Sequence, residues 1–343
     1  MIFLGIESSC DETALALVEN GRRVLSSVIS SQVDVHAKWG GVIPEIAARE
    51  HLNALSSMYR NMLKSSDFKA KNVDAIAVTQ GPGLIGCLLV GVSFAKGLAQ
   101  ACRKPLIPVN HVHAHVHGAL LGLDAKYEDI FPTLALVVSG GHTNLYFMKT
   151  PTHFELLAHT IDDACGESFD KVGKMLGLPY PGGPHVETLA RGGDPSKVNL
   201  PRMIERKSQM AFSYSGLKTA VSRTIVNQPA AGHKPEDIAA AFQEEALGQI
   251  VRKLELARKA RPESRSIIVA GGVAANHRFK AMVQGTTSLP VLFPPLNYCS
   301  DNGAMIAALG YHQWKAADFD PTLAWDVYSR YPFEQFLAAT EQK

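Results

Sequence analysis

The chain has 343 residues, of which 46% are hydrophobic and 19% charged, and its formal net charge is +2. This length suits two lobes of ordinary size, and the composition excludes an intrinsically disordered chain. The small net charge neither requires nor excludes a nucleic-acid partner, because phosphate binding depends on a local basic patch.

The first half of the chain predicts alternating strands and helices. In chain order these are a strand at IFLGIE (2–7), a polar turn at ESSCDET, a returning strand at ALALVEN, a buried strand and glycine turn at VDAIAVTQGPG (73–83), a helix at LIGCLLVGVSFAKGLAQA (84–101), a short strand at PLIPVN and a second helix from near His111. This order predicts parallel strands that are joined by helices within one sheet.

The second half repeats this plan. Its elements are a strand, a glycine turn and a strand at TLALVVSGGHTNLYFMKT (133–150), a strand and glycine turn at SIIVAGGVAAN (266–276), a helix at HRFKAMVQG, a strand at PVLFPP and a final helix from near Asp301. An internal duplication accounts for the repeat. We therefore expect an α/β fold of two duplicated lobes, each a mixed β-sheet flanked by helices, with a cleft between them. We expect the N-terminal lobe at 1–130, completed by 311–343, and the C-terminal lobe at 131–310 with a mainly helical insert at about 160–245.

Membrane segments and disulfide bonds are not expected. No apolar run has the length that crosses a bilayer, and the start, MIFLGIESSCDET, lacks the basic region of a signal peptide. The five cysteines are scattered, odd in number and without a CxxC pair. This usage is typical of reduced thiols, so we expect a cytoplasmic protein.

Three glycine turns, SGGHT, QGPG and AGGVAAN, follow apolar strand-like runs. Glycine lets the backbone approach an anion closely, and free N–H groups at a turn attract it. None of the turns matches the P-loop or the GxGxxG pattern, so each alone is weak evidence. ESSCDET and SGGHT are hairpin turns at equivalent places in the two halves, where they would hold phosphate, and AGGVAAN would support a purine and ribose. This arrangement is typical of the architecture shared by actin, Hsp70 and the sugar kinases.

The segment NHVHAHVHG places four histidines at alternate positions. In a helix capped by Asn110, His111 and His115 share one face and can chelate one cation, whereas in a strand all four would line one face. The run GALLGL that follows favours the helix. Asp301 lies at the matching point of the second half, so two imidazoles and a carboxylate form a candidate metal set. The alternatives are histidines that only pack, Asp301 as a helix N-cap, and Cys299 as a rival ligand.

The histidines do not indicate a metalloprotease. A zincin needs HExxH, in which the glutamate is the general base, but Val112 follows His111 here. An ATPase or kinase of the same architecture remains an alternative, although it does not account for the metal set. Basic patches are predicted at Arg202, Arg206 and Lys207, and at 252–265, where an exposed helix face explains the charges equally well.

Taken together, the motifs resemble the tRNA N6-adenosine threonylcarbamoyltransferase family, bacterial TsaD type. In order they are GIESSCDET, GGVIPE, TQGPGL, NHVHAH, VSGGHT, GESFDK, YPGGP, FSYSGLKT, AGGVAAN and CSDNGAM. They extend over essentially the whole chain to about Gly310. The resemblance implies transfer of a threonylcarbamoyl group from threonylcarbamoyl-AMP to N6 of adenosine 37, in tRNAs that read codons starting with A, with release of AMP.

The resemblance also implies the roles of particular residues. These are a metal set of His111, His115 and Asp301 for iron (Fe²⁺) or zinc, adenylate contacts at Val137, Val138, Ser139, Gly140 and Gly141, a ribose side at Asp170, Gly183 and Glu187, and a nucleotide contact at Asn276. Glu187 departs from the family pattern, because many relatives have aspartate there.

The implied donor is an activated mixed anhydride, so the reaction needs positioning, charge stabilisation and removal of an N6 proton rather than a Ser–His–Asp nucleophile. For proton transfer the candidates are His142, Asp11 and Glu12, with turn capping as the alternative role of Asp11. The resemblance further implies two partners, the paralogous subunit TsaB and the P-loop ATPase TsaE. The apolar helix at 84–101 is a candidate for the pairing surface, and simple burial is its alternative.

Overall fold

The structure is a computed structural model that describes residues 1–65, 72–204 and 209–330. The chain divides into two α/β units, unit 1 with Met1–His117 and the chain from Asp301 onward, and unit 2 with Gly118–Ser300. Each unit contains one mixed sheet, which confirms the predicted α/β class. The contacts divide the chain after His117 and after Ser300, whereas the sequence placed the lobe boundaries near 130 and 310.

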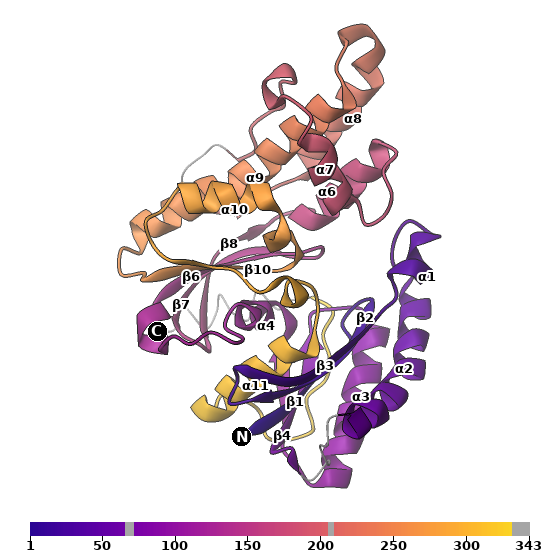
Figure 1. Ribbon diagram of the computed structural model, residues 1–343, viewed down its shortest axis with the longest axis vertical. Helices are drawn as coiled ribbons and strands as arrows, with labels where there is room; N and C mark the ends of the chain where they lie inside the picture. Colours follow the sequence, from indigo (N-terminus) through magenta and orange to yellow (C-terminus); the bar gives the residue numbers. More distant parts are fainter. Residues whose placement is uncertain (66–71, 205–208, 331–343) are drawn as a thin grey trace. The chain divides into compact units, whose positions relative to one another are not determined.

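Unit 1 is a five-stranded sheet with helices on both faces (Figure 1). Its elements are β1 (Ile2–Glu7), β2 (Glu12–Glu19), β3 (Arg23–Ser31), α1 (Val33–Ala37), α2 (Pro44–Ser65), β4 (Ala75–Gly81), α3 (Ile85–Cys102), β5 (Leu106–Asn110), α4 (His111–Gly118) and α11 (Gly303–Ala316). The strand order is β3-β2-β1-β4-β5, with β1, β2 and β3 antiparallel and β1, β4 and β5 parallel.

Alternation along β1 explains why both faces of this sheet are covered. Leu4 and Ile6 point to the face where α2 and α3 pack. Phe3 and Gly5 point to the other face, where Phe3 meets the ring of Tyr311 from α11. The sheet is therefore buried on both sides, as its continuous apolar strands require.

Helix α11 approaches β1 so closely that only glycines fit at the contact. A Cβ at Gly5 would lie 2.0 Å from the carbonyl oxygen of Gly303, and a Cβ at Gly303 would lie 2.7 Å from the amide nitrogen of Ala16. The close approach fixes the first turn of α11 against the sheet of unit 1. Asp301, two residues earlier, is held in the same unit.

Unit 2 repeats the plan of unit 1. Its elements are α5 (Tyr127–Ile130), β6 (Thr133–Val138), β7 (Thr143–Thr150), β8 (His153–Thr160), α6 (Cys165–Met175), α7 (Gly182–Ala190), β9 (Ala211–Phe212), α8 (Ser215–Ala231), α9 (Pro235–Ala260), β10 (Ser266–Ala270), α10 (His277–Gly285) and β11 (Val291–Leu292). The order β8-β7-β6-β10-β11 has the same antiparallel and parallel pairings as β3-β2-β1-β4-β5, which confirms the duplication.

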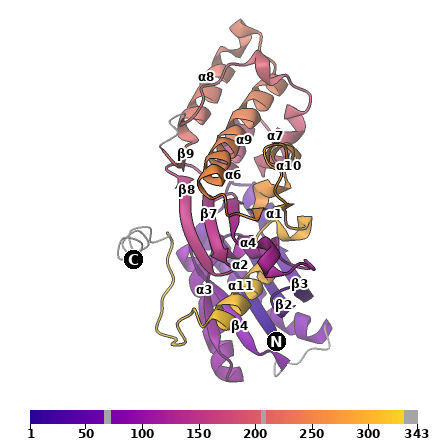
Figure 2. The ribbon, with the colours of Figure 1, turned by 90° about the vertical axis from the view of Figure 1, so that its left-hand side faces the viewer.

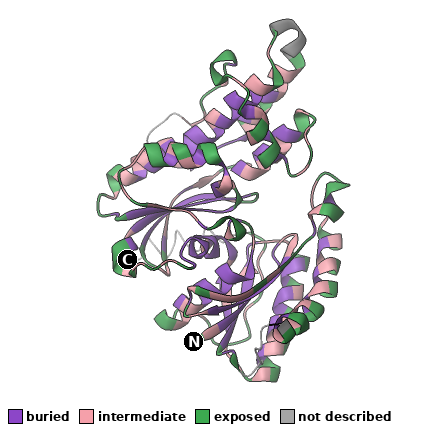
Figure 3. Ribbon diagram, viewed as in Figure 1, coloured by how far each residue is buried: buried purple, intermediate pink, exposed green. Residues whose placement is uncertain are grey.

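The helical insert of unit 2 is α6, α7, α8 and the first part of α9. Figure 2 shows α8 and α9 running side by side, and α9 also packs on α7. Ile238 and Phe242 of α9 are fully buried in the apolar core of this unit. Figure 3 shows that the central strands of each sheet, such as β1 and β6, are buried.

Helix α3 is the one helix of the described residues that is long and apolar enough to cross a membrane. This is weak evidence for a membrane segment, because Val92, Ala95 and Ala99 of α3 pack in the core of unit 1. Ile85 and Leu89 on the same helix are 42% and 44% exposed, so α3 also has an uncovered apolar side.

Candidate metal centre and nucleotide pocket

The histidine segment forms the helix predicted for it, α4, which ends at Gly118. Asn110, the last residue of β5, caps it by accepting a hydrogen bond at 3.0 Å from the amide of His113. One helical turn then brings the rings of His111 and His115 to a centroid separation of 4.8 Å. Both side chains are buried, with 4% and 1% exposed.

Asp301 lies beside this pair. Its Oδ1 atom is 3.6 Å from His111 Nε2 and 3.3 Å from His115 Nε2, and one ligand atom from each residue lies within 4.8 Å of the others. The N-cap of α11 is Asn302, whose side chain accepts from the amide of Met305 at 2.9 Å, so capping is not the role of Asp301. These three residues form a possible metal site within unit 1.

His115 supports this interpretation. Neither of its ring nitrogens makes a hydrogen bond within the described part of the chain, although both are buried. A buried imidazole without a partner is costly unless a ligand satisfies it, and a cation held with Asp301 would do so. The alternative ligand Cys299 is not in this group, because its thiol points to the carbonyl oxygens of Pro294 and Pro295, each at 3.7 Å.

Glu7, which the sequence reasoning did not select, lies on the other side of His111. It ends β1, is fully buried, and its Oε2 accepts a hydrogen bond at 3.0 Å from His111 Nδ1. Burial raises the pKa of Glu7, but the attraction to His111 outweighs it and holds that pKa below its usual range. Burial lowers the pKa of His111, but the carboxylates of Asp301 and Glu7 raise it to about 9. The site is therefore strongly cation-attracting.

Two of the three residues predicted for proton transfer also lie in unit 1. Burial, followed by repulsion from Asp301 and Asp11, raises the pKa of Glu12 to about 9. The Glu12 carboxyl therefore holds its proton at neutral pH in this state and accepts a hydrogen bond at 3.2 Å from Ser31 Oγ. The main-chain carbonyl of Asp11 accepts from the amide of Gln32 at 3.0 Å, which secures the turn between β1 and β2.

The third candidate, His142, closes the SGGHT turn of unit 2. Its carbonyl oxygen accepts from the amide of Ser139 at 2.8 Å, and its amide donates to Ser139 Oγ at 3.2 Å. Gly140 and Gly141 are exposed with open space around them, so an anion can approach this backbone. Val137 and Val138 precede the turn inside β6 with fully buried side chains, which leaves ligand contact to the turn itself.

The residues predicted for the ribose side surround the start of α7. Oδ1 of Asp170 accepts from the amides of Gly182 and Gly183, at 2.8 and 3.2 Å, and so fixes the first turn of this helix. Glu187, one turn later, accepts at Oε1 from the amide of His277 at 3.1 Å and lies 2.9 Å from its Nδ1. The longer side chain at this position therefore links α7 to α10.

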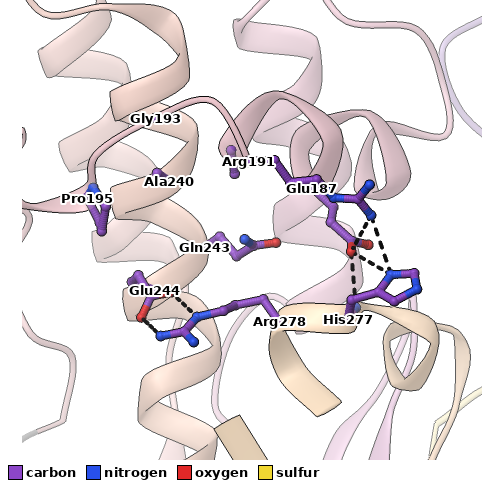
Figure 4. Close-up of a pocket in the computed structure, with 10 residues that line it drawn as sticks. Glu187, Arg191, Gly193, Pro195, Ala240, Gln243, Glu244, His277 and Arg278 are labelled. Carbon is purple, nitrogen blue, oxygen red and sulfur yellow. Dashed lines mark hydrogen bonds and ion pairs between the residues drawn. The ribbon is translucent and has the colours of Figure 1, made fainter. Parts of the chain in front are cut away.

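Glu187 lines a pocket of about 490 Å³ in unit 2 (Figure 4). Its lining also includes Arg191, Gln243, Glu244, His277 and Arg278. Arg191 pairs with Glu187 at 3.1 Å, and Arg278 pairs with Glu244 through both ends of its guanidinium group. Each of these two arginines of the pocket lining is therefore neutralised by a glutamate, and the ion pairs hold the four side chains in place.

Asn276 contributes to this pocket indirectly. Its Oδ1 accepts from the amide of Phe279 at 2.9 Å as the N-cap of α10, and its Nδ2 donates to Gln243 Oε1 at 2.9 Å. The amide nitrogen of Gln243 has no partner among the described residues, although the side chain is only 6% exposed. Gln243, which the sequence did not indicate, therefore offers the pocket a hydrogen-bond donor.

Part of the charge in the predicted basic patches is paired among the described residues. Arg206 and Lys207 lie outside the described residues, while Arg202 is exposed. In the run 252–265, Arg252 pairs with Glu245 at 2.7 Å and Arg261 pairs with Glu155.

The duplicated mixed sheets define an α/β protein of the actin-like architecture. Full-length HypF, in its phosphate- and nucleotide-bound form, aligns with 93% of this chain and 47% of its own at a TM-score of 0.63 and 13% identity. Component A of the (R)-2-hydroxyglutaryl-CoA dehydratase of Acidaminococcus fermentans aligns with 92% of this chain and 99% of its own, with a TM-score of 0.55 and 14% identity. At these identities the likeness shows the fold alone.

The sequence comparisons define the family. The sequence model of the TsaD family, tRNA N6-adenosine threonylcarbamoyltransferase, matches residues 23–308 of this chain. The protein of that name from Carboxydothermus hydrogenoformans is 48% identical over 324 residues, covering 93% of this chain and 94% of that protein. Its counterpart from Thermosipho africanus is 46% identical over 319 residues, covering 92% and 95%. The chain belongs to this family, and it is a transferase that modifies tRNA by threonylcarbamoylation of adenosine.

Proposed function

We propose that threonylcarbamoyl-AMP is the donor, that N6 of adenosine 37 is the acceptor in tRNAs that read codons starting with A, and that AMP is released. The observation that carries this proposal is the buried set of His111, His115 and Asp301, which an ATPase or kinase does not need. The acyl group of such a donor is already activated, so the chain has to position it, stabilise the developing charge and accept a proton from N6.

His111, His115 and Asp301 would hold one divalent ion, iron (Fe²⁺) or zinc. Two neutral imidazoles and one carboxylate suit either ion and leave coordination positions open for a substrate. A bound ion would supply Lewis-acid stabilisation of charge on donor oxygens. The orphaned ring nitrogens of His115 support this assignment, because they are buried and lack other partners in the described residues.

Unit 2 would bind the adenylate part of the donor. The exposed backbone of Gly140 and Gly141, next to Ser139 and with Val137 and Val138 behind it, suits the phosphate. The pocket next to α7 suits the nucleoside, with Asp170, Gly183 and Glu187 on the ribose side and Asn276 acting through Gln243. In support, Gln243 presents a donor to a pocket of about 490 Å³, which has room for a nucleoside.

His142, Asp11 and Glu12 remain our candidates for proton transfer. The raised pKa of Glu12, about 9, favours a role as a proton donor or as a group that ionises only when charge around it changes. His142 belongs to the turn proposed for the phosphate, and histidine is the side chain most often used for proton transfer.

The partners proposed from the family are tRNA, the paralogous subunit TsaB and the P-loop ATPase TsaE, all in the cytoplasm. Helix α3 supports a pairing surface on unit 1, because Ile85 and Leu89 are exposed there and Leu52 of α2 is 67% exposed. Helices α2 and α3 pack on each other, so these side chains belong to one helical layer.

A reconstituted transfer assay tests the proposal. The chain, its two partner proteins, unmodified tRNA and threonylcarbamoyl-AMP labelled in the threonine are incubated, and the tRNA is digested to nucleosides. We expect label on adenosine and one AMP per modified nucleoside, and no transfer to tRNA whose adenosine 37 is replaced. Stoichiometric ADP from ATP with the chain alone, and no labelled nucleoside, would favour the ATPase or kinase alternative.

A further inference from the structure

The two ring nitrogens of His111 face different carboxylates. Nδ1 lies 3.0 Å from Glu7 Oε2, and Nε2 lies 3.6 Å from Asp301 Oδ1. Asp301 sits with His115, whereas Glu7 comes from the end of β1 and has no place among the three ligand atoms. His111 is therefore held between an anion on the ligand side and an anion behind it.

The Glu7 carboxylate is itself fixed. Its Oε2 also accepts from Thr79 Oγ1 of β4 at 2.6 Å, and its Oε1 accepts from the amide of Ser9 at 2.5 Å. Three donors converge on a fully buried carboxylate, so its rotamer and charge are well determined. Oxygen atoms in this position can only accept a hydrogen bond from His111 when its Nδ1 carries the proton.

We propose that Glu7 is a positioning residue of the metal centre, which keeps the proton of His111 on Nδ1 and so directs the Nε2 lone pair toward Asp301 and the ion. Carboxylate–histidine–metal arrangements fix both the tautomer and the orientation of the ring, and they make the imidazole a better ligand. The inference rests on the metal role proposed above and adds a second carboxylate to it.

Substitution Glu7→Gln tests the inference. The amide keeps the size of the side chain, replaces one acceptor oxygen with an NH2 donor and removes the negative charge. We expect the affinity of the apo chain for Zn²⁺, measured by competition with a chelating dye, to fall by about 10–100-fold. Glu12→Gln is the control, because Glu12 is a half-buried carboxyl that interacts with Asp301 but has no hydrogen bond to His111 among those described.

The two variants separate the specific contact with His111 from the general effect of an amide in place of a carboxyl near Asp301. A larger loss for Glu7→Gln than for Glu12→Gln supports the inference, and equal affinities for Glu7→Gln and the wild type overturn it while leaving the metal site intact. If the wild type itself binds no Zn²⁺, the proposed metal role fails and the inference fails with it.

A second measurement needs no substitution at Glu7 and so does not depend on how that variant folds. In the Zn²⁺-loaded wild type with ¹⁵N-labelled histidine, the His111 signals are identified by their loss in His111→Asn. We expect a protonated Nδ1 and a metal-bound Nε2. The reverse assignment, with Nδ1 bound to zinc, would overturn the inference.

Discussion

The contact between α11 and β1 offers a sharp perturbation of the metal centre from outside it. In Gly303→Ala, the new Cβ would lie 2.7 Å from the amide nitrogen of Ala16, 2.8 Å from the carbonyl carbon of Leu15 and 2.9 Å from the carbonyl oxygen of Gly5. All three atoms are backbone, so the helix must move. Reaching the 3.4 Å at which ordinary contact begins requires a shift of about 0.7 Å from 2.7 Å.

That shift has two expected consequences. Overpacking of this kind costs about 1–3 kcal/mol in the free energy of unfolding. Metal–ligand distances tolerate only about 0.2 Å, so displacement of Asp301 with the start of α11 should also weaken Zn²⁺ binding. The matched control is Gly97→Ala in α3, where a Cβ meets nothing within 4 Å and should stabilise the helix by about 0.5–1 kcal/mol.

Tryptophan fluorescence is a suitable assay because all three tryptophans, Trp39, Trp314 and Trp325, belong to unit 1. Urea denaturation followed by this signal therefore reports the unit that contains the substitution. Zn²⁺ affinity is measured on the same samples by competition with a chelating dye. If Gly303→Ala unfolds at the wild-type midpoint and binds Zn²⁺ with unchanged affinity, the glycine contact does not position Asp301.

Three further predictions concern other parts of the chain. Gln243→Glu turns the donor of the pocket into an acceptor, so AMP binding measured by calorimetry should weaken by about 1–3 kcal/mol, and unchanged affinity would exclude this contact. Gly166→Ala places a Cβ 2.6 Å from the carbonyl oxygen of Ser139, so the same titration should show weaker AMP binding, and full affinity would argue against the turn as the phosphate site. Burial, with repulsion from His117 and Arg22, lowers the pKa of His312 from 6.5 to about 2. Because the unfolded chain binds this proton first, the free energy of unfolding is unaffected by His312 protonation above pH 6.5 and falls as the pH drops from 6.5 toward 2. His312→Asn should reduce the acid dependence of unit 1 unfolding by up to about 1.4 kcal/mol per pH unit, and an unchanged dependence would contradict the shift.

Much of the fold follows from local pattern and repetition. The apolar strands, the glycine turns and the order of elements recur in the two halves, which was enough to predict duplicated α/β lobes. The third strands, β3 and β8, were not recognised. The sequence of β3, RVLSSVISS, is rich in serine and largely exposed at the sheet edge, so it lacks the alternation that marks a half-buried strand.

The assignment of α11 depended on a contact that local pattern does not reveal. The helix follows β11 in the chain and looked like the last element of the second lobe, but Gly303 packs on Gly5, almost the whole chain away. Asp301 consequently lies in the same unit as His111 and His115. The grouping of the three residues could be predicted from the motifs, whereas the unit that holds them could not.

The supporting residues were hidden for a similar reason. Glu7 reads as the last residue of a strand, and Gln243 reads as part of an apolar helix. Each becomes informative only through a partner far along the chain, His111 for the first and Asn276 for the second. A polar residue at the carboxyl end of a parallel strand nonetheless indicates a candidate site residue, because ligands bind at that edge of the sheet.

X-ray absorption spectroscopy of the metal-loaded chain identifies the ligands of the ion. With one equivalent of Zn²⁺, we expect two imidazole nitrogens at about 2.0–2.1 Å and oxygen ligands for the remainder, with no sulfur. His115→Ala should lose the metal in elemental analysis. A spectrum with thiolate ligands, or a His115→Ala chain with full metal content, would contradict the proposed centre.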